Sequence, residues 1–261
     1  MMKIIIITQE DSFVVPKNIE KILHLENVEL LKVIDIDSNY SLVNKKSYFI
    51  KGFGLMQTIK MGLKVVSAKV LNSIDIVTSY KLAIKPKSLK AVSERYNIKF
   101  ERIKNPNSAE FLEEVRALQP DLIVSYSAPV VFKEPLLKIP KHGCINLHCS
   151  YLPHYAGVMP SFWTLYKKEK TTGATVHYMD SKIDNGAILN QKEIQISPNE
   201  TMFSLIVKSK EIGGNIMCET IRDIQNSNIK IKENFAEKGS YFTWPTVDQF
   251  QEFTKNGGKL I

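Results

Sequence analysis

The sequence has 261 residues, of which 44% are apolar and 24% are charged, a composition typical of a globular protein with a full hydrophobic core and unlike that of a disordered chain. Its 35 Lys and Arg residues outnumber 27 Asp and Glu residues, which gives a net charge of +8. The lysines are not packed into one continuous run, and this favours small anionic ligands at least as much as nucleic acid. The three cysteines form no CxxC pair, so the sequence predicts neither a disulfide framework nor a zinc site.

Predicted strands and helices alternate along the first half of the chain. Residues 3–7 form an apolar run that turns polar too soon for a secretory signal and predicts a first strand. In chain order the next predicted elements are a helix at 18–26, a strand at 28–37, helices at 53–74 and 88–97, a strand at 98–103, a helix at 108–119 capped by Ser108, and a strand at 121–127. No apolar run reaches the roughly 20 residues that cross a bilayer, so we expect a cytoplasmic protein without a membrane partner.

The alternation continues through the second half. The predicted elements are a strand at 143–148, a helix at 159–168, strands at 173–180 and 186–197 joined by a DNG turn, and a helix at 199–225 capped by Asn199 or Thr201. This order predicts an α/β fold with a doubly wound, mostly parallel, Rossmann-like sheet. From about residue 230 the chain is rich in aromatic residues and ends in an amphipathic helix. We therefore expect a main domain over 1–225 and a small appendage over 226–261, which could form the contact of a homodimer.

Asn146 and His148 lie at the carboxyl end of the predicted strand 143–148, where open parallel sheets bind their ligands. Because they are two residues apart on a strand, their side chains point to the same side. An amide beside an imidazole suits a carbonyl reaction, since Asn can donate to a developing oxyanion and His can move the proton of an attacking amine. The carboxylate that would orient the ring could be Asp180, Asp184 or Glu193, and Asp184 lies in a turn able to reach a cleft.

Several short motifs in the right order resemble those of the 10-formyltetrahydrofolate-dependent formyltransferases. They cover about residues 120–197 and comprise Asn146-Leu147-His148-x-Ser150-x-Leu152-Pro153, Gly157, Gly173-x-Thr175-x-His177 and Ile183-Asp184-Asn185-Gly186. The resemblance implies that Asn146, His148 and Asp184 are the catalytic trio and that 1–225 is the catalytic domain. Asn146 would steady the tetrahedral oxyanion and His148 would manage protons, while Asp184 would orient or polarise the ring. No metal is implied.

The resemblance also implies the cofactor, 10-formyltetrahydrofolate, and where its pterin binds. The grip would come mainly from backbone of two stretches, represented by Ser125, Tyr126, Ser127, Ala128 and Pro129 in the first and by Tyr178, Met179, Asp180 and Ile183 in the second.

Departures from the family narrow the expected substrate. Several members carry an arginine where this chain has Ala156, and members that act on glycinamide ribonucleotide have a glycine-rich turn after the first strand, whereas residues 8–16 contain no glycine. Gly52 and Gly54 are too isolated to replace that turn. Only 36 residues follow position 225 (261 − 225), fewer than the tRNA-holding barrel of methionyl-tRNA formyltransferases needs, and the first predicted strand begins the sequence. We therefore expect neither that barrel nor the extra domain of the folate hydrolases.

The remaining members formylate an amino sugar attached to a nucleotide, for bacterial surface polysaccharides such as the lipopolysaccharide O-antigen. Tyr155, Trp163 and Trp244 could stack on the base, with lysines meeting the pyrophosphate, although Trp163 could equally be a core residue. We therefore expect a small-molecule substrate and no nucleic-acid partner. Two alternatives stay open: a methionyl-tRNA formyltransferase-like enzyme without the usual C-terminal domain, and a folate-binding module without catalysis. A Ser150 nucleophile lacks a GxSxG elbow, and a redox role of Cys144 or Cys149 lacks support.

Overall fold

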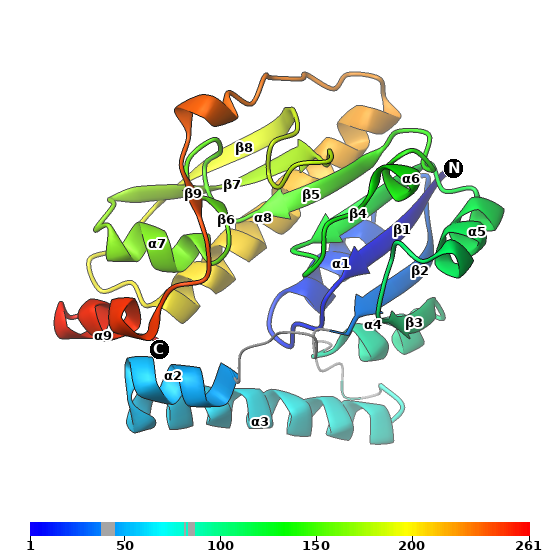
Figure 1. Ribbon diagram of the computed structural model, residues 1–261. Coiled ribbons are helices and arrows are strands. Elements are labelled where there is room, and N and C mark those ends of the chain that lie inside the picture. Colours follow the sequence, from blue (N-terminus) through cyan, green and yellow to red (C-terminus); the bar gives the residue numbers. More distant parts are fainter. Residues whose placement is uncertain (38–44, 81, 83–86) are drawn as a thin grey trace.

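A seven-stranded sheet forms the centre of the protein (Figure 1), whose computed structural model describes residues 1–37, 45–80, 82 and 87–261. The strand order is β3-β2-β1-β4-β5-β7-β8. The strands are β1 (Met2–Thr8), β2 (Val28–Ile36), β3 (Lys99–Ile103), β4 (Leu122–Tyr126), β5 (Cys144–His148), β7 (Thr171–Tyr178) and β8 (Ile188–Gln195). The pairs among β1 to β5 are parallel, whereas β7 and β8 are antiparallel. The predicted doubly wound, mostly parallel sheet is confirmed.

The isoleucines of β1 explain why this strand is central. Ile4 and Ile6 belong to one core cluster, Ile5 and Ile7 to the cluster on the other face, and all four are fully buried. A strand covered on both faces needs such a continuous apolar run. The first cluster includes residues of α1 (Val15–Leu23), α4 (Leu89–Arg95) and α8 (Met202–Gln225), and the second includes residues of α5 (Ala109–Leu118) and α6 (Glu134–Leu137).

Helix ends differ from the predictions in ways that hydrogen bonds explain. Helix α8 is capped by Thr201, whose hydroxyl accepts from the N–H of Ser204 while the Ser204 hydroxyl accepts from the N–H of Thr201. Ser108 is the N-cap residue of α5, as predicted, but its hydroxyl donates to the carbonyl of Asn105 and makes no capping bond to the helix. The segment 53–74 contains a break at Gly54 (φ 81°), which separates α2 (Lys45–Phe53) from α3 (Leu55–Val77).

The aromatic tail packs on the rest of the chain. Its two-residue strand β9 (Tyr241–Phe242) pairs with β6 (Ala156–Gly157), and its last helix α9 (Val247–Lys255) lies beside α2 and near α7 (Pro160–Tyr166) (Figure 1). Phe250 and Phe253 are buried in a cluster with aromatic residues of α2 and α7. A dimer contact through the tail and the domain boundary at 225 stay predictions. Within the described part of the chain, no helix is both long enough and apolar enough to span a membrane.

Candidate active site

A cavity of about 1030 Å³ opens at the carboxyl ends of β1, β4 and β5. It is lined by Asn146, His148 and Asp184 together with segments from both halves of the chain. The carboxyl ends of parallel strands meet at one edge of the sheet, so the position agrees with the predicted ligand site.

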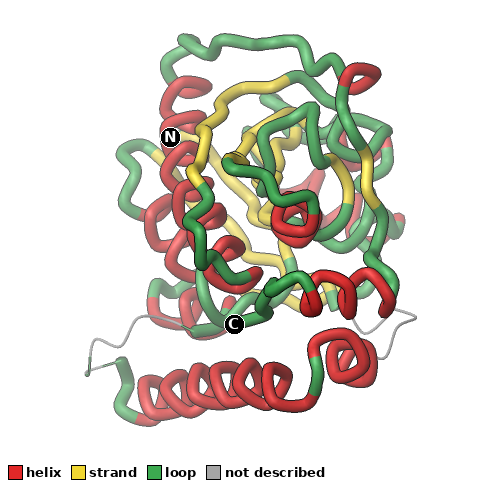
Figure 2. Tube along the Cα trace, turned by 90° about the vertical axis from the view of Figure 1, so that its left-hand side faces the viewer, coloured by secondary structure: helices red, strands yellow, loops and turns green. Residues whose placement is uncertain are grey.

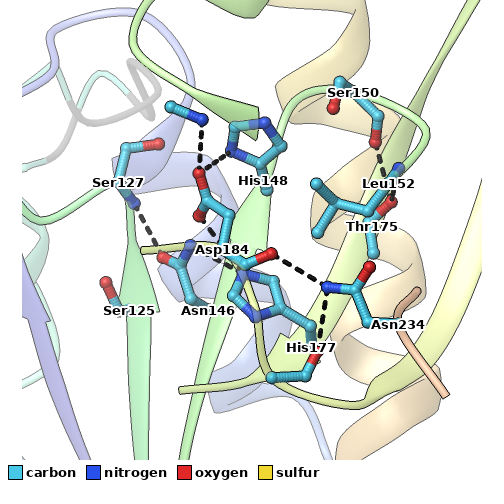
Figure 3. Close-up of polar contacts among 12 residues, drawn as sticks. Ser125, Ser127, Asn146, His148, Ser150, Leu152, Thr175, His177, Asp184 and Asn234 are labelled. Carbon is cyan, nitrogen blue, oxygen red and sulfur yellow. Dashed lines mark hydrogen bonds and ion pairs between the residues drawn. The ribbon is translucent and has the colours of Figure 1, made fainter. Parts of the chain in front are cut away.

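Hydrogen bonds fix the amide of Asn146 in one orientation (Figure 3). The backbone N–H of Ser127 donates to Asn146 Oδ1 over 3.3 Å, so the amide nitrogen faces the other way, toward His177 Nε2 at 3.3 Å. His177 Nδ1 lies 2.7 Å from the carbonyl of Tyr178 and must donate to it, so Nε2 is the ring nitrogen that faces both the Asn146 amide and, at 3.5 Å, Asp184 Oδ1. One amide hydrogen of Asn146 points toward His177, and the other can serve a ligand in the cavity.

His148 is held between a carbonyl and a carboxylate. Its Nε2 donates to the carbonyl of Tyr155 over 2.8 Å, and its Nδ1 lies 3.3 Å from Asp184 Oδ2. Both the ring and the carboxylate are more than nine-tenths buried, with side-chain exposures of 7% and 9%. Of the three candidate carboxylates, Asp184 is therefore the one that reaches the ring. As predicted, Asn146, His148 and Asp184 lie together at one cavity.

Asp184 is surrounded by donors that keep it ionised. Burial alone would raise its pKa, but His148, His177 and the backbone N–H of Gly157, which donates to Oδ2 over 2.8 Å, together hold the pKa well below the usual range of an aspartate. Gly157 has φ 94°, and a Cβ there would lie 2.2 Å from the carbonyl oxygen of Phe242. Only glycine can bring its N–H to Asp184 while β6 pairs with β9.

His177 is a site residue to which the sequence motif assigned no role. It lies on β7 opposite Asn146, and its Nε2 is 3.5 Å from Asp184 Oδ1. The ring thus supports two members of the trio at once. Its i, i+2 spacing from Thr175 was the available signal, since alternate residues of a strand share a face.

Asn234, in the tail, is the other functional residue that the sequence analysis missed. Its side-chain amide donates to the carbonyls of Asp184 (2.9 Å) and Gly186 (3.2 Å), and its exposure is only 9% (Figure 3). The tail also reaches the loop after β5, where the N–H of Tyr155 donates to the hydroxyl of Ser240. Residues beyond 225 therefore hold the loops that carry Tyr155 and Asp184.

We expect Asn234→Leu to lower kcat by about 10- to 100-fold, because the Asp184 backbone loses its two anchoring bonds and small displacements of catalytic groups are costly. Steady-state kinetics alongside a thermal melt will separate this from loss of fold. Asn190→Leu is the matched control, since the Asn190 amide bonds to Glu219 on the surface. Equal kcat in the Asn234 variant and wild type would refute a positioning role.

The residues predicted to bind cofactor and substrate divide into two groups. Those that line the cavity are Ser125, Ser127, Ala128, Pro129, Met179, Asp180, Ile183 and Trp244. Four others do not line it. Tyr126 is buried in the core and Tyr178 packs against it. The rings of Tyr155 and Trp163 both stack on Phe242. For Tyr155 the backbone carbonyl, not the ring, contacts His148. The binding roles of all these residues stay predictions.

The rival chemistries find little support at this site. The Ser150 hydroxyl donates to the carbonyl of His154 and is used structurally. Burial raises the pKa values of the Cys144 and Cys149 thiols, the opposite of what an activated cysteine needs. Among the residues with described positions, no group of three or more His, Cys, Asp or Glu side chains could hold a metal ion.

Comparison with known proteins gives the family. Residues 41–221 match the family described as formyl transferase, and the chain belongs to it. It is 38% identical over 192 residues to the bifunctional polymyxin resistance protein ArnA of Wigglesworthia glossinidia brevipalpis, covering 72% of this chain and 28% of that protein. It is 32% identical over 187 residues to the methionyl-tRNA formyltransferase of Thermotoga maritima, covering 72% of this chain and 59% of that protein. The chain thus spans less than two thirds of the length of either relative.

Solved structures share the fold at lower identity. An N-formyltransferase from Helicobacter canadensis, in complex with folinic acid and dTDP-3-aminofucose, has a TM-score of 0.61 at 19% identity, over 97% of this chain and 80% of that one. Glycinamide ribonucleotide transformylase 1 of Symbiobacterium toebii has a TM-score of 0.61 at 16% identity, over 89% and 95% of the two chains. These likenesses establish the Rossmann-like formyltransferase fold and leave the acceptor open.

Proposed function

We propose that the protein transfers the formyl group of 10-formyltetrahydrofolate to the primary amine of a nucleotide-linked amino sugar. The observation that carries the proposal is the meeting of Asn146, His148 and Asp184 at one cavity. At about 1030 Å³, this cavity is as large as the upper range of small-molecule sites, which suits a folate and a second substrate together.

The cofactor, when bound, supplies an electrophilic formyl carbon. The residues of the chain stabilise the developing charge and move the proton. Asn146 offers its second amide hydrogen to the carbonyl oxygen as negative charge develops there, which is worth about 3 kcal/mol for one well-placed donor. His148 takes the proton released by the attacking amine and gives it to the cofactor nitrogen from which the formyl group departs, a contribution of about 10²- to 10⁴-fold. Asp184 keeps the ring oriented and stabilises its positive charge. The products are a formamide and tetrahydrofolate.

A buried cation supports an anionic acceptor. Lys210, on α8, lines the cavity and its Nζ lies 2.5 Å from Asp11 Oδ2, with side-chain exposures of 16% and 12%. Burial alone would raise the pKa of Asp11, but Lys210 and the N–H groups of Phe13 and Val14 hold it below its usual range, so the pair is charged. An ammonium group has three N–H donors and Asp11 takes one of them, so Lys210 can also donate to a phosphate oxygen of a nucleotide in the cavity.

Trp244 adds an aromatic ring to the lining of the cavity. It lines the wall, and its indole Nε1 is buried without a hydrogen-bond partner among the residues whose positions are described. A ring with a free donor can stack on a base and donate to it.

The second candidate is a methionyl-tRNA formyltransferase-like activity, which the relatives of that name favour. The two candidates differ in what they bind. A nucleotide-sugar enzyme should be stabilised by a free nucleoside diphosphate in the presence of folinic acid, whereas the alternative should bind methionyl-tRNA with a strong dependence on salt.

We expect thymidine, uridine, guanosine or cytidine diphosphate to raise the melting temperature of the folinic acid complex, and the double variant Asp11→Asn/Lys210→Met to lose the rise. The double change is needed because removing Lys210 alone would leave Asp11 buried and unpaired. Lys208→Met is the control, since Lys208 bonds to Gln195 and Glu200 at the surface of the same helix. Stabilisation and formylation of methionyl-tRNA alone would reject the nucleotide-sugar proposal.

A further inference from the structure

Helix α3 has an apolar face that is exposed, and no other described part of the chain covers it. Ten of the large apolar side chains that are at least 36% exposed lie on this helix, among them Leu55 (61%), Leu63 (64%) and Val77 (83%). Figures 1 and 2 both show α3 along the lower edge of the molecule, with the remaining chain on one side of it only. An uncovered apolar surface of this length is a site of interaction.

The exposed residues share one side of the helix. Met56, Ile59, Leu63, Val66, Val70 and Val77 follow one another at intervals of three, four or seven residues, as residues on one helical face do. The opposite side turns to the protein. Ala68 and Asp75 are buried there, and Asp75 pairs with Arg95 on α4 at 2.5 Å. The inward side therefore holds α3 in place and leaves the apolar side outward.

The charge of this region has one sign. Between positions 45 and 77 the sequence has six lysines (Lys45, Lys46, Lys51, Lys60, Lys64, Lys69) and a single acidic residue, Asp75, so these 33 residues carry +5 (6 − 1) of the total charge of +8. Asp75 forms an ion pair with Arg95 and does not offset the charge of the lysines on the outer side. Lys60 and Lys69 are exposed, flank the apolar face on its two sides, and form no ion pair with any described residue.

The charge pattern distinguishes two candidate partners for the apolar face, a second copy of this chain and a phospholipid surface. A second copy of the chain would bring the same lysines and no exposed acidic side chain from α3 to meet them, whereas paired helices usually complement their flanking charges. Anionic phospholipid headgroups supply that complement. A helix with an apolar face and flanking lysines lies in the interface of a bilayer, with its apolar side in the acyl region and its lysines among the headgroups.

We propose that α3 docks the protein on the surface of an anionic phospholipid bilayer, apolar face inward. The inference does not depend on the proposed function. It also bears on the site, because α2 joins α3 to the cavity: Tyr48 and Phe49 of α2 contact the ring of Trp244, which lines the cavity wall, with centroids 6.4 and 6.5 Å apart. The cavity wall of the docked enzyme is thus next to the element that rests on the lipid.

Co-sedimentation with vesicles tests the proposal. Wild-type protein is expected to bind vesicles of phosphatidylcholine with about 30% phosphatidylglycerol, to bind pure phosphatidylcholine at least about tenfold more weakly, and to be released by high salt. Leu63→Glu should lower binding by at least about tenfold. Ile231→Glu is the matched control, because Ile231 is 58% exposed and lies away from α3.

A second pair of variants keeps the test independent of the apolar substitution. Lys60→Gln/Lys69→Gln should weaken binding to the anionic vesicles, while Lys192→Gln/Lys255→Gln, which removes two exposed lysines elsewhere, should not. Absence of binding to either vesicle, or unchanged binding by Leu63→Glu, overturns the proposal. Light scattering measures the oligomeric state of the same variants. If wild type is a dimer, does not bind vesicles, and becomes a monomer on Leu63→Glu, the apolar face of α3 is a contact with a second copy of the chain instead.

Discussion

Replacing Asp184 by Asn is expected to lower kcat by about 10³- to 10⁴-fold. The neutral amide cannot stabilise positive charge on His148, whose Nδ1 lies 3.3 Å away, and its NH₂ group would face one of the donors that now surround the carboxylate. Single-turnover formylation measures the effect. Asp248→Asn, the same change on an exposed residue of α9, should leave kcat within about twofold.

The same substitution has a pH signature in stability. The pKa of Asp184 is lower in the folded protein than in the unfolded chain, so the ionised carboxylate stabilises the fold at every pH above the unfolded value. The difference in unfolding free energy between wild type and Asp184→Asn should therefore be constant near neutral pH and shrink as the pH falls below about 3.9. Urea titrations at several pH values measure it, and a difference that grows in acid would contradict the assigned charge state.

His148→Ala should lower kcat by about 10²- to 10⁴-fold, because the group that takes the proton from the amine is gone. Binding of folinic acid should change little, since the stretches expected to hold the pterin, including Ser127 to Pro129 and Met179, line the cavity separately from the ring. Stopped-flow kinetics and a folate titration measure the two quantities.

His142→Ala is the matched control for this substitution, as His142 precedes β5 and does not line the cavity. Turnover of His148→Ala within about tenfold of wild type would leave the proposed mechanism without its base. Loss of folate binding together with turnover would instead point to a role of the ring in holding the cofactor.

Much of the fold could be predicted because its signals are local. The isoleucine run of β1, the alternation of strands and helices, and the position of Asn146 and His148 at the end of β5 all follow from neighbouring residues. The two-residue strands β6 and β9 could not be predicted, because neither has a repeating pattern and each forms only through pairing across about 80 residues.

Two functional features were beyond local reasoning for different reasons. Asn234 acts on a loop 50 residues earlier in the chain, and a lone asparagine in a polar stretch carries no signal of such a contact. The helical periodicity of 53–74 predicted a helix, but periodicity shows only that one face is apolar, not whether that face turns to the core or to the outside. The exposed face of α3 is also not a continuous apolar run, so it does not resemble a membrane span.

The bond from Asn234 to the Asp184 loop makes the geometry of the site depend on a segment that is synthesised after all seven strands of the sheet. A nascent chain that has released β1 to β8 from the ribosome already holds all three reactive groups, yet the loops that carry them lack Asn234 and Ser240. We therefore expect a chain truncated before residue 234 to lose the bonds that hold the carbonyls of Asp184 and Gly186. Any tag or fusion must likewise leave residues 234–242 free to reach back across the finished sheet.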